Sequence, residues 1–142
     1  MTAFEPVEID LAGARVHALA RTGPRPVVFV HGLSASSAYF ADAAGRAELA
    51  GRGLLALDLP GFGRTPAPEG FGFTIEEQAE VVAAAVARLD APATLVGHSM
   101  GGTISLLAAE RRGARLEAFV AAEAILWAGA MLSEHVERRT AP

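Results

Sequence analysis

ATLVGHSMGG, at residues 93–102, is the stretch that decides the fold of this chain. Its first four residues form an apolar run typical of a strand, and helix-forming residues follow the stretch. Between them, Gly97 and Gly101 stand two residues before and two residues after Ser99. A turn sharp enough to lift a serine hydroxyl above a sheet leaves little room for side chains at those two positions. The stretch therefore predicts a strand, a tight turn at Ser99 and a helix that starts at Met100.

A serine in this setting is a candidate nucleophile. The pattern G-x-S-x-G between a strand and a helix is that of a nucleophile elbow, whereas the same five letters in a chain with 15 glycines are a weak signal. The backbone N–H of Met100 would point at the oxyanion that forms when Ser99 attacks a carbonyl. His98, directly before the serine, is expected to pack or to hydrogen-bond locally.

Composition excludes several other classes of protein. A length of 142 residues suits one domain. The net charge is −4 with acids and arginines spread along the chain, so we expect no nucleic-acid partner. Cysteine is absent, which excludes thiol catalysis and thiolate metal sites. No cofactor and no metal site are predicted, and the absence of lysine argues against a phosphate-binding nucleotide loop.

The location of the protein is predicted from two stretches. The first residues, MTAFEP, contain neither a basic region nor an apolar core, so a secretory signal is not expected. The most apolar stretch, residues 118–132, is too short to span a bilayer comfortably. We therefore expect a cytoplasmic protein with no membrane partner.

Strands are predicted elsewhere from the hydrophobic pattern. Residues 7–20 alternate apolar and polar positions on either side of a glycine, which indicates an antiparallel hairpin. Residues 26–30 form a continuous apolar run, typical of a central parallel strand covered on both faces. Further strands are predicted at 54–57 and near 116–122.

Helices are predicted between these strands, at 34–50, 75–89 and 100–112. The second follows a capping box formed by Thr74 and Glu77. The resulting order predicts the α/β class: a mostly parallel sheet with helices on both faces and an N-terminal antiparallel hairpin.

Binding sites in such sheets form at the carboxyl ends of the strands. Residues 31–33, residues 58–65 and Ser99 all follow predicted strands directly. Their side chains and backbones are therefore expected to meet at one end of the sheet.

Three segments together resemble the N-terminal half of the α/β-hydrolase family. They are VVFVHG at 27–32, LDLPGFGRT at 57–65 and LVGHSMGG at 95–102, and the likeness extends over about residues 7–122. The resemblance implies a truncated α/β-hydrolase fold. Residues 1–142 would then be a single partial domain, with 123–142 as a tail helix.

The resemblance also implies a site and an activity. Ser99 would be the nucleophile, and the backbone N–H groups of Leu33 and Met100 would form the oxyanion hole. The residues that would shape the elbow and its neighbouring loop are His31, Gly32, Gly97, His98 and Gly101. The implied activity is that of a serine hydrolase on small ester-like or related acyl substrates, because relatives that open epoxides or displace halide carry aspartate at the nucleophile position.

A serine nucleophile needs a base and an orienting acid, which in this family follow it in the order acid, then histidine. Downstream of Ser99, the pair in a usable order is Glu123, which closes the strand after the elbow helix, and His135. Glu123 is either the acid or a carboxylate that caps the tail helix, and His135 lies beside an apolar stripe, so the base is expected to be missing. Asp58 is expected to brace its loop. The alternative function is a non-catalytic remnant that serves association or ligand binding.

The strand near 116–122 has one further implication. Without later strands it would form an apolar sheet edge with unpaired N–H and C=O groups. We therefore expect possible self-association through this exposed edge.

Overall fold

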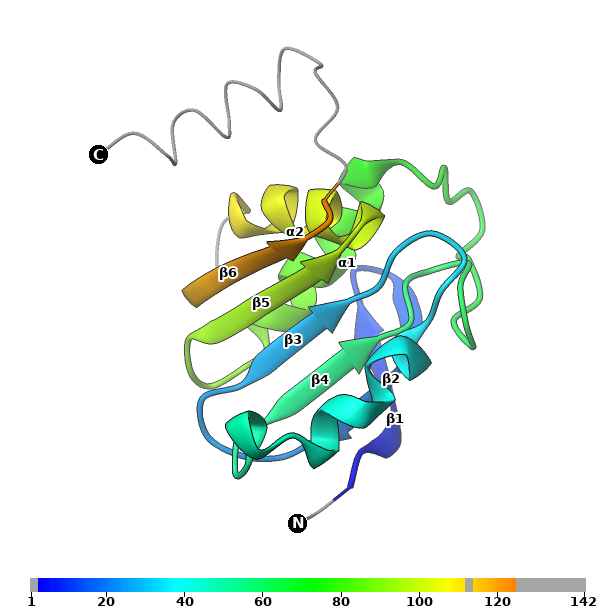
Figure 1. Cartoon of the computed structure of the whole chain (residues 1–142). Helices are drawn as coiled ribbons and strands as arrows, with labels where there is room; N and C mark the ends of the chain where they lie inside the picture. Colours follow the sequence, from blue (N-terminus) through cyan, green and yellow to red (C-terminus); the bar gives the residue numbers. More distant parts are fainter. Residues whose placement is uncertain (1–2, 112–113, 125–142) are drawn as a thin grey trace, which may run out of the picture.

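Six strands form one sheet in the order β1-β2-β4-β3-β5-β6, with helices on both of its faces (Figure 1). The computed structural model of the chain describes residues 3–111 and 114–124. The strands are β1 (Glu5–Leu11), β2 (Ala14–Arg21), β3 (Val27–Val30), β4 (Leu54–Leu57), β5 (Ala93–His98) and β6 (Leu116–Ala122). The helices are two 3₁₀ segments, η1 (Ser37–Gly45) and η2 (Ala47–Leu49), and two α-helices, α1 (Ile75–Ala87) and α2 (Met100–Ala109).

The sheet is parallel from β4 through β3 and β5 to β6, and antiparallel at β1 and β2. The hairpin turns at Ala12 and Gly13, whose φ angles are 47° and 82°. Two consecutive positive φ angles match the right-handed twist of the strands that the turn joins. The predicted α/β class, with a mostly parallel sheet and an N-terminal hairpin, is confirmed.

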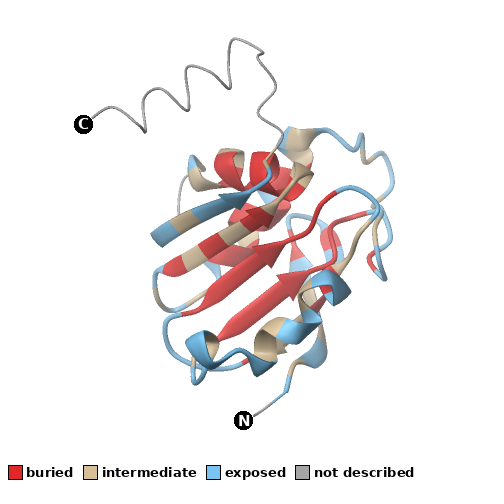
Figure 2. Cartoon of the chain, in the orientation of Figure 1, coloured by how far each residue is buried: buried red, intermediate tan, exposed pale blue. Residues whose placement is uncertain are grey.

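The two faces of the sheet are covered by different helices. The α-helices lie behind the sheet in Figure 1 and share the larger core with one face, which includes Val28, Leu57 and Leu95. On the other face, Phe40 from η1 packs against Val27 and Phe29 in a smaller cluster. Strands β3 and β4 are buried throughout, as Figure 2 shows, because both of their faces are covered.

The predicted helix over 34–50 is wrong in type and continuity. The chain forms η1 and η2 instead, and Arg46 between them has an extended ψ of 130°. The buried Arg21 side chain of β2 contacts both segments: its guanidinium donates to the carbonyl of Ala44 at 2.8 Å and to that of Leu49 at 2.5 Å. These contacts hold η1 and η2 against β2 and satisfy the buried guanidinium.

The helix starts predicted from local signals agree better with the structure. Thr74 and Glu77 form the predicted capping box at the start of α1, with the Thr74 hydroxyl accepting from the Glu77 N–H at 3.1 Å. Helix α2 begins at Met100 as predicted and ends at Ala109, short of the expected 112. The predicted tail helix falls outside the described residues from 125 onward.

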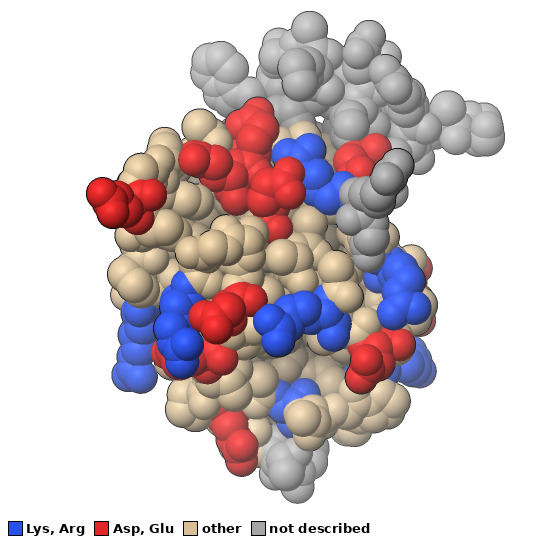
Figure 3. Space-filling view, turned by 180° about the vertical axis from the view of Figure 1, so that it is seen from behind, with Lys and Arg blue, Asp and Glu red and all other residues tan. Residues whose placement is uncertain are grey.

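Surface charge and hydropathy add two observations. On the face seen from behind in Figure 3, arginine side chains are interspersed with aspartate and glutamate, so that face has no continuous basic patch. Within the described ranges, none of the helices has the length and apolar character that crossing a bilayer requires.

Candidate active site

Ser99 lies between β5 and α2 in a backbone conformation that L-residues rarely adopt. Its φ is 53° and its ψ is −124°, outside the three broadly allowed regions. The Ser99 N–H donates to the Ala122 carbonyl at the end of β6 at 2.9 Å, and the Ser99 carbonyl accepts from the Gly102 N–H at 2.8 Å. Such strain persists only where surrounding structure holds it in place, and it clusters at active sites.

The two glycines around Ser99 are explained by backbone contacts. A Cβ on Gly97 would overlap the Gly101 carbonyl oxygen and lie 2.6 Å from the Gly102 Cα. A Cβ on Gly101 would overlap the carbonyl oxygens of Val30 and His31. These neighbours are main-chain atoms and cannot rotate away, so both glycines are required for the turn to pack against the end of β3.

The loop after β3 passes directly beside the serine. A Cβ on Gly32 would lie 3.1 Å from the Ser99 Cβ and 3.3 Å from the His98 carbonyl oxygen. Leu33 follows, with 68% of its surface exposed. Within the described residues, the backbone N–H groups of Leu33 and Met100 donate no hydrogen bond to another protein group.

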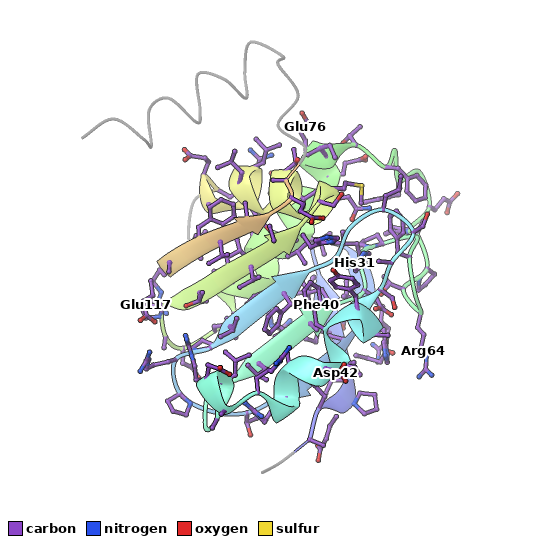
Figure 4. All side chains as sticks on the ribbon, viewed as in Figure 1. His31, Phe40, Asp42, Arg64, Glu76 and Glu117 are labelled. Atoms are coloured by element: carbon purple, nitrogen blue, oxygen red, sulfur yellow. The ribbon has the colours of Figure 1, made fainter. Side chains whose placement is uncertain are left out.

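His31, labelled in Figure 4, is fully buried and joins two loops at the carboxyl end of the sheet. Its Nδ1 lies 2.7 Å from the Gly32 carbonyl oxygen, and its Nε2 accepts from the Leu59 N–H at 3.0 Å. Because Nε2 accepts, the ring proton belongs on Nδ1, where it donates to Gly32. Burial lowers the pKa of His31 from its usual value, which keeps the ring neutral. His31 thus holds the backbone that precedes Leu33.

Asp58 is also buried and is saturated by main-chain donors. Its Oδ1 accepts from the Ser37 N–H at 2.6 Å, and its Oδ2 accepts from the Arg64 N–H at 2.8 Å. Burial alone raises the pKa of Asp58, but the Arg64 and Ser37 N–H groups outweigh it and lower the pKa below its ordinary value. A Cβ on Gly63 would overlap the same carboxylate. Asp58 therefore braces its loop, as expected, while Arg64 extends its side chain outward (Figure 4).

His98 makes two side-chain contacts on the η1 face of the sheet. Its ring stacks on Tyr39, with centroids 4.7 Å apart and planes 19° apart. Its Nε2 lies 3.3 Å from Glu123 Oε2. Its Nδ1 is buried and has no partner among the described residues. Sequence reasoning missed Tyr39 as a neighbour of this site, because nothing local to position 39 indicates a contact with residue 98.

Glu123 lies directly after β6, close to the main chain that holds Ser99. Its φ is 51°, and its side chain is 84% exposed. Its one described side-chain contact is with His98, so a carboxylate does stand next to the elbow, although it orients no described histidine toward Ser99.

The described histidines are His17, His31 and His98, and none forms a hydrogen bond with Ser99. The first contacts Glu8, and the other two have the contacts given above. His135, the remaining candidate base, lies outside the described residues. The described part of the chain also contains no group of three or more His, Asp or Glu side chains that could hold a metal ion.

Comparisons with known proteins identify the fold family of the chain. The chain is 37% identical over 98 residues to a putative carbamate hydrolase, RutD, of Variovorax paradoxus, which covers 66% of this chain and 36% of that protein. It is 32% identical over 126 residues to haloalkane dehalogenase 2 of Mycobacterium tuberculosis, which covers 87% of this chain and 43% of that protein.

Among solved structures, the haloalkane dehalogenase DatA from Agrobacterium tumefaciens C58 superposes with a TM-score of 0.75 at 29% identity, covering 87% of this chain and 42% of that chain. The chain thus spans less than half the length of these three relatives. The sequence profile of the α/β hydrolase fold matches residues 25–140, a range that contains the loop after β3, the Asp58 loop and the strained turn at Ser99. On this match and on the sheet that carries these loops, the chain belongs to the α/β-hydrolase fold family.

Proposed function

We propose that this chain carries the nucleophile and the oxyanion-binding groups of a serine hydrolase that acts on esters or related acyl substrates. The observation that carries the proposal is the Ser99 backbone, held at a φ of 53° between β5 and α2. A strained serine at this place in the sheet exposes its hydroxyl at the carboxyl end of the strands, where substrates bind in α/β sheets.

The chemistry follows from the groups around the serine. Ser99 Oγ attacks the acyl carbon, the carbonyl electron pair moves to oxygen, and the serine proton passes to a base. The resulting oxyanion accepts hydrogen bonds from the N–H groups of Met100 and Leu33. The first stands at the amino end of α2, where the helix dipole also favours negative charge. Loss of one such donor in a hydrolase typically raises the barrier by about 2.7–4 kcal/mol.

A serine nucleophile favours attack on acyl carbons over the displacement of halide that the names of the dehalogenase relatives indicate. Displacement of halide from a saturated carbon by serine would leave an ether on the enzyme, which water does not cleave readily. Attack on an acyl carbon leaves an ester, which water hydrolyses at its carbonyl. Carbamates, which the name of one relative gives as its substrate, also contain an acyl carbon.

The alternative function is a non-catalytic module that binds a ligand or a partner with the same fold. The observation that favours it is that none of the described histidines forms a hydrogen bond with the Ser99 side chain. Since an unassisted serine is a weak nucleophile near neutral pH, a base from outside the described residues decides between the two functions.

Labelling with a fluorophosphonate tests the proposal directly. The full chain is expected to react, and Ser99→Ala is expected to lose the label. Ser36→Ala is the matched control because it removes a hydroxyl whose described contact is the Ala38 N–H at the start of η1, and it should keep the label. Label that survives in Ser99→Ala would contradict the assignment of the nucleophile. Hydrolysis of p-nitrophenyl esters that is equal in the natural chain and in Ser99→Ala would favour the non-catalytic alternative.

A further inference from the structure

The loop after β3 carries the Leu33 N–H on a strained turn. The Gly32 carbonyl accepts from the Ala35 N–H at 3.3 Å, which closes a turn with Leu33 and Ser34 at its centre. Ser34 has a φ of 58°, a conformation for which turns favour glycine or asparagine at this position. Such strain persists only where the surrounding structure holds it in place. The turn therefore depends on contacts outside itself.

Both ends of this segment are anchored to the loop after β4, which lies beside it at the carboxyl end of the sheet (Figure 1). Before the turn, His31 Nε2 accepts from the Leu59 N–H at 3.0 Å. After the turn, the Ser37 N–H donates to Asp58 Oδ1 at 2.6 Å. The two anchors on the β4 side are neighbours in the chain, so one short stretch holds residues 31–37 at both ends.

Asp58 is itself fixed by main-chain and side-chain contacts. Its N–H donates to the His17 carbonyl of β2 at 2.9 Å, and its carbonyl accepts from the Thr65 hydroxyl at 2.7 Å. Its second carboxylate oxygen accepts from the Arg64 N–H at 2.8 Å. Only 2% of the surface of Asp58 is exposed, so its side chain cannot turn out to water. The carboxylate therefore gives Ser37 an acceptor that stays in one place.

We propose that Asp58 is a positioning residue for the oxyanion hole of the serine hydrolase proposed above. It acts through the Ser37 N–H, which fixes the turn that carries the Leu33 N–H. This role rests on the proposed hydrolase function, because it gives the Leu33 N–H an oxyanion to stabilise beside Ser99. The second donor, the Met100 N–H, belongs to the first residue of α2 and does not depend on this anchor.

A loosened turn weakens a donor without removing it. An oxyanion donor is effective at about 2.7–3.1 Å from the oxygen on which charge develops. When one end of the turn is released, the Leu33 N–H spreads over several positions and occupies the effective one for a smaller fraction of the time. Since loss of a whole donor slows the reaction by roughly 10²–10³-fold, we expect a released turn to slow it by roughly ten- to hundredfold.

Comparison of Ser37→Pro with Ser37→Ala isolates the anchoring N–H. Both variants lose the hydroxyl, but only Ser37→Pro loses the N–H. Position 37 accepts proline because it is the first residue of η1, and Ser36 before it is extended with a ψ of −179°. At saturating fluorophosphonate, Ser37→Pro should label roughly ten- to hundredfold more slowly than Ser37→Ala, with a similar half-saturating concentration. Damage to the fold would instead lower the fraction of chains that react. Equal maximal rates would overturn the proposal.

Arg21→Met is the matched control for weakened packing of η1. It removes the contacts of the guanidinium with the carbonyls of Ala44 and Leu49, which lie away from residues 31–37. This variant should lower the free energy of unfolding while its labelling rate stays close to that of the natural chain. A loss of rate as large as that of Ser37→Pro would assign the effect to loose packing of η1 and overturn the proposal.

Asp58→Ala tests whether the carboxylate acts through Ser37. Alone, it removes the acceptor of the Ser37 N–H and should slow labelling about as much as Ser37→Pro does. In the Ser37→Pro background that contact is already absent, so Asp58→Ala should slow labelling further by less than about twofold. Independent losses that multiply in the double variant would show that Asp58 acts by another route.

Amide hydrogen exchange at Ala35 separates this role from the proposed function. The Ala35 N–H closes the turn onto the Gly32 carbonyl, so its exchange rate reports how often the turn opens. Exchange at Ala35 should be roughly tenfold faster in Ser37→Pro than in Ser37→Ala, whether or not Ser99 reacts with the probe. Absence of label in the natural chain would contradict the proposed function, whereas equal exchange in the two variants would overturn the positioning role.

Discussion

Replacement of Ser99 by glycine should stabilise the fold, and the size of the effect follows from the backbone. A non-glycine residue at a φ of 53° and a ψ of −124° stores about 1–3 kcal/mol of strain. Glycine removes that strain but costs about 0.5–1 kcal/mol in unfolded-state entropy relative to alanine. Both backbone hydrogen bonds of residue 99 remain in place. Ser99→Gly should therefore be more stable than Ser99→Ala by about 1 kcal/mol.

The two variants form a matched pair, because both lose the hydroxyl and they differ in the freedom of the backbone. Urea unfolding followed by circular dichroism gives the free energy of unfolding of each. A difference of about 1 kcal/mol corresponds to roughly 3–5 °C in Tm for a chain of this size. If Ser99→Gly were equal to Ser99→Ala or less stable, the turn would not be strained, and the reasoning that identifies it as a functional site would fail.

Two further predictions concern the support of the site. Gly101→Ala should lower the free energy of unfolding by about 3 kcal/mol in urea titrations, because its Cβ would overlap main-chain oxygens at the end of β3. The control is Gly45→Ala, whose Cβ would meet nothing within 4 Å and which should change the free energy of unfolding little. The lowered pKa of buried His31 means that, below a pH of about 6.5, the unfolded chain binds a proton that the folded chain does not. The free energy of unfolding should therefore decrease as the pH is lowered through this window, by at most about 1.4 kcal/mol per pH unit. The control His31→Gln can still accept from Leu59 and donate to Gly32, and its free energy of unfolding should depend less on pH between pH 7 and pH 5. An equally steep profile in His31→Gln would assign the titration to another group.

Local signals predicted most of the elements correctly. The capping box at Thr74 starts α1, and the glycines around Ser99 mark the turn between β5 and α2. Each of these signals depends on residues within about four positions of one another, so it can be read along the chain. The prediction of one helix over 34–50 is wrong, and the contacts of η1 and η2 with the Arg21 guanidinium of a distant strand could not be read from local sequence.

The features of the candidate site also divide into those that the sequence determines and those that depend on tertiary structure. By itself, the sequence determined the strained serine, its flanking glycines and the order of the loops at the carboxyl ends of the strands, since these depend on sterics and on hydrophobic periodicity. Only the tertiary structure decided that His98 stacks on Tyr39 and that Asp58 is saturated by main-chain donors. Those features are contacts between segments far apart in the chain, and their partners become defined when the sheet order brings the segments together.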